Sequence, residues 1–165
     1  MYRKDFQYDL PDKLIAKQPT KRRSDSRLLV LNGDGSIEHC QFPDLLEHVR
    51  PGDLMVFNNT QVIRARLFGI KETGGRLEVL IERILDSNTA LAHIRMSKTP
   101  KQEFKIYFED RYTAIVSDKR NGLFLLNFDT LISQILDSIG HIPLPPYLDR
   151  VDNEIDKLRY QTVYA

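Results

Sequence analysis

The alternation of apolar and polar residues in the middle of the chain predicts a series of β-strands. Six segments between residues 62 and 128 carry this pattern, and short turns such as Thr73-Gly74-Gly75 separate them. Short, closely spaced strands without an intervening helix are typical of small antiparallel barrels. The pattern therefore predicts a β-barrel domain over residues 62–128, with strands at 62–71, 76–86, 90–96, 104–108, 111–117 and 123–128.

The segment before this barrel has a mixed pattern of strands and helix. Residues 28–39 read as a hairpin around the turn Asn32-Gly33-Asp34-Gly35, and residues 42–49 as a short helix with a proline in its first turn. The continuous apolar run Leu54-Met55-Val56-Phe57 is typical of a strand that is covered on both faces. These elements indicate an α/β arrangement.

The segment after the barrel returns to the same mixed character. Asp129 is expected to cap a helix that runs to Ile139 and ends at Gly140, and a further helix is expected over residues 152–160. The predicted fold class is therefore an α/β domain with an inserted small antiparallel β-barrel. Residues 1–61 and 129–165 form the discontinuous α/β domain, which is barrel-like and incomplete in this chain.

A proline-rich segment, Gly140-His141-Ile142-Pro143-Leu144-Pro145-Pro146-Tyr147, follows the predicted helix. Its prolines fix an extended, polyproline-like rod that presents His141 and Tyr147 at little further entropic cost. A histidine side chain titrates near neutral pH, so His141 is a candidate acid, base or hydrogen-bond donor. Tyr147 and Tyr160 are candidates for stacking on a base. The alternative is a purely structural strap across a domain junction.

The polar run Asn58-Asn59-Thr60 follows the predicted apolar strand, where open α/β folds place ligand-binding groups. The amide side chains can read the hydrogen-bonding edge of a base or a sugar. An ordinary turn explains the same residues, because Asn and Thr favour turns.

The composition is that of a globular chain, with 41% hydrophobic and 28% charged residues and a net charge of +1. No apolar run reaches the length of a membrane span, and the N-terminus lacks the apolar stretch of a signal peptide. The single cysteine, Cys40, fits a reducing compartment, so a cytoplasmic location is expected. His39 and Cys40 are adjacent and point to opposite faces of a strand, so no metal site is expected.

Basic residues gather locally despite the balanced total charge. Arg66 shares one strand face with Arg64 and Phe68 if alternation holds, and a second basic stretch spans residues 95–105. Such patches can follow a phosphate backbone, although a solvated basic face is the simpler explanation. The candidate phosphate contacts are Arg66 and, near the N-terminus, Lys21, Arg22, Arg23 and Arg27.

Several segments together resemble the N-terminal half of the S-adenosylmethionine:tRNA ribosyltransferase-isomerase family of queuosine biosynthesis. They occur in the family's order along nearly the whole chain. Two departures stand out: Gln61 and Arg64 occupy positions where the family usually has a basic residue and a proline, and a later Ala-Pro-Thr-Ala-Gly-Leu-His-Phe-like block is absent. The matching segments include Tyr8-Asp9-Leu10-Pro11, Ser26-Arg27-Leu28-Leu29, Pro51-Gly52-Asp53-Leu54, Phe57-Asn58-Asn59-Thr60, the proline-rich segment and Tyr160-Gln161-Thr162-Val163-Tyr164.

The resemblance implies an enzyme that transfers the ribosyl part of S-adenosylmethionine, its co-substrate, to 7-aminomethyl-7-deazaguanine at the tRNA wobble position. The ribosyl group is isomerised and the product is epoxyqueuosine. It implies the tRNA anticodon stem–loop as partner, His141 as acid, base or orienting group, and Asn58, Asn59 and Thr60 as contacts to base or ribose. The 165 residues alone are expected to be inactive and to self-associate through the incomplete α/β domain. The alternatives are a non-enzymatic RNA-binding barrel and a structural remnant.

Overall fold

The computed structural model describes residues 1–98, 100 and 102–162. These residues divide into two compact units. Unit 1 contains residues 1–58 and 146–149, and unit 2 contains residues 59–145 and 150–162. Lys101 of the second basic stretch, and Val163 and Tyr164 of the last resembling segment, lie outside the described residues. Within the described ranges, no helix has both the length and the apolar character needed to cross a membrane.

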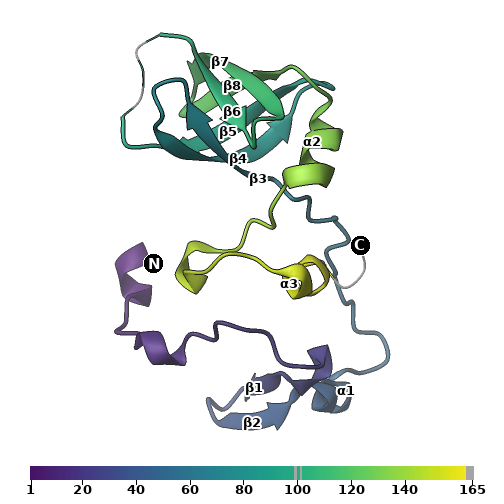
Figure 1. Ribbon diagram of the computed structural model, residues 1–165. Helices are drawn as coiled ribbons and strands as arrows, with labels where there is room; N and C mark the ends of the chain where they lie inside the picture. The colour runs from purple at the N-terminus through teal and green to yellow at the C-terminus, as the bar shows by residue number, and fades with distance from the viewer. Residues whose placement is uncertain (99, 101, 163–165) are drawn as a thin grey trace. The chain divides into compact units, whose positions relative to one another are not determined.

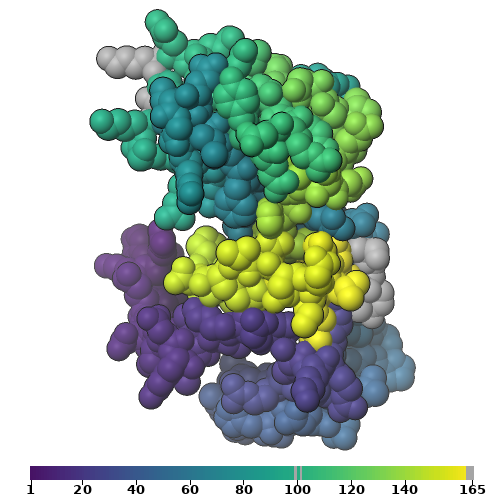
Figure 2. Space-filling view, in the orientation of Figure 1, coloured from purple at the N-terminus to yellow at the C-terminus, as the bar shows by residue number. Residues whose placement is uncertain are grey.

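Unit 2 is built on a closed, six-stranded antiparallel barrel, which confirms the predicted barrel (Figure 1). The strands close in the order β3-β4-β5-β8-β7-β6. The space-filling view shows side chains packed continuously over the strands on the face in view (Figure 2). The strands are β3 (Arg66–Lys71), β4 (Arg76–Ile84), β5 (Thr89–Arg95), β6 (Phe104–Phe108), β7 (Tyr112–Arg120) and β8 (Leu123–Phe128).

The first strand begins at Arg66, four residues later than the alternation predicted. Val62 instead exchanges two hydrogen bonds with the side chain of Gln161: its N–H donates to Oε1 (3.0 Å) and its carbonyl accepts from Nε2 (2.8 Å). The backbone of this segment is thus satisfied by a side chain of the same unit rather than by a neighbouring strand.

The alternating apolar positions fill the barrel, and α2 (Ile132–Ile139) extends the same core. Leu67, Val79 and Leu126 have no exposed surface. Helix α2 lies beside the barrel in Figure 1 and buries four apolar residues, Ile132, Ile135, Leu136 and Ile139. Full burial of each such side chain contributes about 1.5–3 kcal/mol. The barrel and α2 therefore share one apolar core.

The predicted start of α2 is wrong. The N-cap is Leu131, and no side chain caps the helix. The carboxylate of Asp129 instead accepts the backbone N–H of Thr113 at 3.1 Å from both oxygens. This pairing uses Asp129 to join the ends of β7 and β8. The predicted end at Gly140 and the later helix, α3 (Glu154–Arg159), are confirmed.

Unit 1 contains the predicted hairpin, β1 (Arg27–Leu31) with β2 (Ile37–Gln41), and the predicted short helix. That helix consists of a 3-10 turn (Phe42–Asp44) and α1 (Leu45–His48). Further 3-10 turns in this unit cover Arg3–Phe6, Asp12–Leu14, Arg23–Asp25 and Pro146–Leu148.

The predicted strand at Leu54-Met55-Val56-Phe57 is wrong: the segment has no regular structure, and Leu54 and Val56 are 88% and 86% exposed. A strand of this kind needs neighbours that accept its backbone hydrogen bonds and cover its two faces, and no described strand pairs with it. The described residues also contain no parallel strand pair. The α/β part of the predicted fold class is therefore only partly confirmed.

Gly69 of β3 is required by the packing inside the barrel. A Cβ atom at this position would lie 2.6 Å from Cγ2 of Ile106 and 3.0 Å from the ring of Phe108. Phe108 in turn stacks on Phe128, with their ring centroids 6.0 Å apart. Ile106 and Phe108 therefore occupy the space that a side chain on residue 69 would need.

We expect Gly69→Val to lower the free energy of unfolding by about 2 kcal/mol, because the added methyl groups force the Phe108 ring and Ile106 apart. Urea denaturation followed by circular dichroism measures the change. Gly33→Val is the matched control, since a Cβ there meets no atom within 4 Å, and its effect should stay within about 0.5 kcal/mol. Equal effects of the two substitutions would contradict this packing.

Candidate functional site

The residues Gly140–Pro145, here called the strap, are fixed to the first residue of β3. The N–H of His141 donates to the carbonyl of Arg66 at 2.8 Å, and the N–H of Arg66 donates to the carbonyl of His141 at 3.2 Å. Gly140 lacks a side chain where a Cβ would clash with the carbonyl oxygens of Leu136 and Arg64. Ile142 and Leu144 are each only 2% exposed. The strap is therefore an anchored element of unit 2.

The side chain of Arg66 provides a second attachment for the strap. Its Nη2 donates to the carbonyl of Leu144 at 3.0 Å, and its Nε lies 2.8 Å from Oε1 of Glu78. The Nε contact is an ion pair rather than a hydrogen bond, because no acceptor is aligned with the buried Nε–H. Arg66 was predicted to contact tRNA phosphate, and that role would require its side chain, only 16% exposed, to leave these partners.

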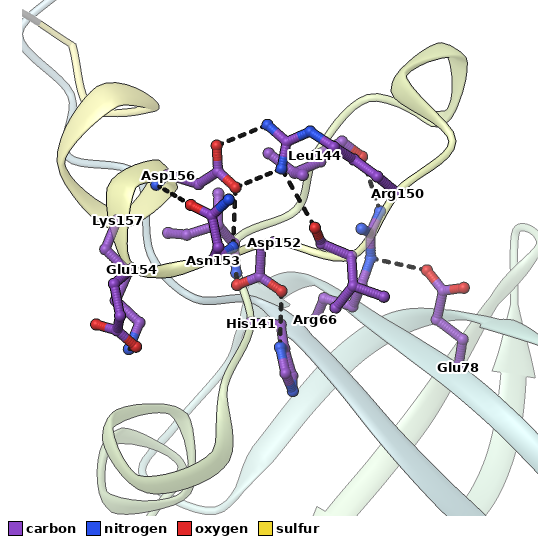
Figure 3. Close-up of polar contacts among 12 residues, drawn as sticks. Arg66, Glu78, His141, Leu144, Arg150, Asp152, Asn153, Glu154, Asp156 and Lys157 are labelled. Atoms are coloured by element: carbon purple, nitrogen blue, oxygen red, sulfur yellow. Dashed lines mark hydrogen bonds and ion pairs between the residues drawn. The ribbon is translucent and has the colours of Figure 1, made fainter. Parts of the chain in front are cut away.

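His141 is held by a buried carboxylate that its position in the sequence did not reveal. Nδ1 of His141 lies 2.7 Å from Oδ1 of Asp152, and Oδ2 of Asp152 accepts the N–H of Ile142 at 3.0 Å (Figure 3). Asp152 is 6% exposed and His141 33% exposed. A carboxylate only accepts hydrogen bonds, so Nδ1 is the donor. Nε2 of a neutral ring is then the free acceptor.

The ring of His141 also contacts an aromatic side chain of the barrel. The centroids of the Phe68 and His141 rings are 5.0 Å apart with an interplanar angle of 67°, an edge-to-face contact. Asp152, Phe68 and the backbone of β3 thus restrict both the position and the rotation of the ring. This restriction is what a group that acts at a defined atom of a substrate needs.

A pocket of about 230 Å³ adjoins this histidine. Its lining includes His141, Asp152, Arg64, Glu154 and Lys157, so it mixes acidic and basic groups. Lys157 and Glu154 pair with each other at 2.6 Å. The pocket can therefore take a small polar group of either charge beside His141.

The segment that carries Asp152 is stabilised by a bidentate ion pair. Nη1 and Nη2 of Arg150 donate to the two oxygens of Asp156 at 2.6 and 2.8 Å, and Asp156 has no exposed surface. Asn153 completes the arrangement: its N–H donates to Asp156, and its Oδ1 accepts from the N–H of Ile155 and of Asp156. The ion pair and the helix cap therefore stabilise the residues on both sides of Asp152 in the sequence.

This ion pair shifts the titration of both partners. The hydrogen bonds from Arg150 hold the pKa of Asp156 below its ordinary value, although burial of the carboxyl opposes the shift. The hydrogen bonds to Asp156 likewise raise the pKa of Arg150. Both groups are therefore charged across the physiological pH range.

Sequence reasoning identified His141 but missed Asp152, Arg150 and Asp156. The Asn153-Glu154-Ile155-Asp156 stretch does carry a readable signal, since an Asn followed three residues later by an acidic residue is a capping pattern. No local pattern points from residue 141 to residue 152, because their contact depends on how the strap and the following turn fold back.

The other predicted ligand contacts lie in a loop, in a 3-10 turn and at the end of α3. Asn58, Asn59 and Thr60 are exposed and follow no strand; the carbonyl of Thr60 accepts from Oγ1 of Thr162 at 2.8 Å. Tyr147 is 61% exposed in a 3-10 turn, and its carbonyl accepts from Nζ of Lys17. Tyr160 is half-buried at the C-terminal end of α3. Their contacts to substrate stay predictions.

The predicted phosphate contacts near the N-terminus belong to unit 1 and are exposed. Arg22 pairs with Asp25 at 2.8 Å, and Arg27 begins β1. Arg23 begins a 3-10 turn, and Lys21 lies just before it in the chain. Their contacts to RNA also stay predictions.

Among the described residues, no three His, Cys, Asp or Glu side chains gather as metal ligands.

The fold and the site define a β-barrel protein with a strap-borne histidine–aspartate pair. A sequence profile described as "Queuosine biosynthesis protein" matches residues 3–165, and the chain belongs to that family. It is also similar to the crystal structure of an S-adenosylmethionine tRNA ribosyltransferase from Thermotoga maritima, with 28% identity and a TM-score of 0.43. That match covers 94% of this chain and 54% of the other, so the chain spans about half the length of this relative.

We expect Asp156→Ala to lower the free energy of unfolding by about 3 kcal/mol at pH 7, because it leaves the Arg150 guanidinium without its buried partner. Glu154→Ala is the matched control. It removes the Lys157 partner that is 85% exposed, and should cost no more than about 0.5 kcal/mol. Urea denaturation measures both, and similar losses would contradict the assigned importance of the Asp156 pair.

The effect of Asp156→Ala should also depend on pH. The pKa of Asp156 is lower in the folded than in the unfolded protein. Its stabilising contribution is therefore complete above the unfolded value, about 3.9, and is lost as the pH falls through the folded value. The difference in unfolding free energy between wild type and variant should shrink as the pH falls below about 4. If the difference grows on acidification, the pKa of Asp156 is not lowered in the folded protein.

Proposed function

We propose that this protein takes part in the transfer and isomerisation of the ribosyl group of S-adenosylmethionine onto 7-aminomethyl-7-deazaguanine at the tRNA wobble position, to give epoxyqueuosine. The observation that carries this proposal is the family match over residues 3–165. The resemblance of the chain to the ribosyltransferase-isomerases specifies the reaction. We further propose that the activity needs the remaining part of the family's length as well, and that residues 62–128 are an insertion in the larger domain.

The reaction requires proton transfers near the sulfonium and the departing base. A sulfonium acidifies the adjacent carbon, so a base that titrates near neutral pH can remove a proton there. Adenine and methionine leave, and adenine leaves more easily when it accepts a proton. His141 supports the first role because its Nε2 is the free ring nitrogen beside a polar pocket. After accepting a proton, the same nitrogen can return it to the leaving adenine.

In this proposal Asp152 is a positioning residue that acts through His141. Its Oδ1 holds Nδ1 of His141 as a donor, and its other oxygen ties it to the strap backbone. It also stabilises the imidazolium that forms when Nε2 takes a proton. Substrate contacts are assigned to Asn58, Asn59, Thr60, Tyr147 and Tyr160, and phosphate contacts to Lys21, Arg22, Arg23 and Arg27.

The test is the formation of epoxyqueuosine by the intact polypeptide that contains this chain. Purified protein is incubated with S-adenosylmethionine and tRNA bearing 7-aminomethyl-7-deazaguanine, and the nucleosides are analysed by mass spectrometry. His141→Ala should lower kcat by about 100-fold or more, the typical contribution of a general acid–base. His39→Ala, an exposed histidine of β2, should have no effect. Normal turnover by His141→Ala would remove it from the mechanism, and no product from wild type would remove the proposed reaction.

Asp152→Asn tests the positioning role separately. The amide can donate to Nδ1 and thereby favour the wrong tautomer, so kcat should fall while the KM for S-adenosylmethionine changes less than about twofold. Asp152→Glu should recover part of the kcat if orientation of the ring is what matters. A rise in KM at unchanged kcat would instead indicate a substrate-binding role for Asp152.

A further inference from the structure

The outer face of β3, β4 and β5 carries an open groove of about 460 Å³ that shares Phe68 and Glu78 with the site described above. Phe68 of β3 lies opposite Glu78 of β4, and Glu78 lies opposite Arg95 of β5. Arg76, two residues before Glu78 on the same strand, lines the same groove, as does Met96. We call this surface the Phe68 groove. It places one aromatic side chain and two arginines on a single strip.

The aromatic side chain of the groove is available to a ligand. Phe68 is 45% exposed although it sits in the middle of a barrel strand. The Phe68 ring also makes an edge-to-face contact with the ring of His141. An exposed aromatic ring beside cations is the arrangement with which proteins stack bases of single-stranded nucleic acid.

The groove is positively charged, because the charge of its acidic residue, Glu78, is neutralised by Arg66. The only acidic side chain of the lining, Glu78, is paired with Arg66 at 2.8 Å. Among the described residues, neither Arg76 nor Arg95 forms an ion pair with a carboxylate. An apolar protein partner would bury these two guanidinium groups without compensation, which is costly. Phosphate groups would compensate them.

The dimensions suit a short stretch of nucleotides. Phe68 and Arg95 are separated by two strand spacings, or about 9.5 Å, which is close to the rise of three stacked nucleotides at about 3.4 Å each. The groove starts at the residue that touches His141, so a strand lying in it would run toward the candidate reaction site.

From these observations we infer that the Phe68 groove binds the single-stranded RNA next to the nucleotide that reacts at His141. Phe68 stacks on a neighbouring base, and Arg76 and Arg95 contact the phosphates that follow. This inference rests on the proposed function, because it takes RNA as the substrate. It adds a binding surface on the barrel to the contacts assigned to unit 1.

The first test measures binding of a fluorescently labelled anticodon stem–loop with an unmodified wobble base to the intact protein by anisotropy. Phe68→Ala should weaken binding about 5- to 150-fold, the range that follows from loss of one base–aromatic stack. Tyr107→Ala is the control: Tyr107 is a similarly exposed aromatic of the neighbouring strand β6 and does not line the groove. Thermal unfolding confirms that both variants are folded.

The second test uses the salt dependence of the same binding. In Arg76→Gln/Arg95→Gln, the slope of log K against log salt concentration should fall by about 0.7 for each lost phosphate contact. Arg111→Gln/Lys119→Gln removes the same charge from exposed barrel positions outside the groove and should leave the affinity nearly unchanged. Equal effects of the two double variants would show that Arg76 and Arg95 contribute only non-specific electrostatic attraction to RNA. That result would overturn the inference.

The outcomes separate this inference from the proposed function. If wild type forms epoxyqueuosine while Phe68→Ala binds RNA and turns over normally, the groove is not the RNA site although the function stands. If wild type binds RNA through the groove and forms no epoxyqueuosine, the reaction is wrong and the binding surface stands. If the groove variants change only self-association in sedimentation experiments, the groove binds a second copy of the protein and the inference fails.

Discussion

The pairing of His141 with Arg66 is the interaction on which the candidate site depends. Two backbone hydrogen bonds, of 2.8 and 3.2 Å, attach the strap to the first residue of a barrel strand. The barrel is rigid because each of its strands has two neighbours and its interior is filled by side chains. These two hydrogen bonds connect the rigid barrel directly to a histidine that lies in irregular structure.

The contacts around the bridge reinforce one another. Pro143 and Pro145 cannot donate backbone hydrogen bonds, so the strap is held by the amides of its other residues and by side chains that contact it. Arg66 supplies a donor to Leu144, and Asp152 accepts from Ile142. Asp152 lies in the sequence between Arg150 and Asp156, whose side chains form a buried ion pair. A residue of the barrel and a short capped helix therefore fix the strap from two sides, which makes a defined tautomer of His141 possible.

Much of the barrel could be predicted from the sequence, because alternation reports which residues face a core. It placed Phe68 on the same face of the strand as Arg66, and in β3 Phe68 is exposed whereas its neighbour Leu67 is fully buried. It failed at Leu54-Met55-Val56-Phe57, because a strand covered on both faces is defined by neighbours that hydropathy does not identify. Only part of the candidate site could be predicted from the sequence. The prolines pointed to His141, whereas Asp152 and the partners of Arg66 depend on contacts between residues that are distant in the sequence. Asp129 shows the same limit, since a tertiary contact replaced the expected cap.

The protonation state of the His141 ring tests the central claim most directly. A long-range ¹H–¹⁵N correlation spectrum of ¹⁵N-histidine-labelled protein distinguishes the two neutral tautomers of the ring from each other and from the imidazolium. The contact with Asp152 predicts a proton on Nδ1 of His141, and the loss of this preference in Asp152→Asn. A proton on Nε2 in the wild-type protein would contradict the account, because the nitrogen proposed to act on the substrate would then be a donor.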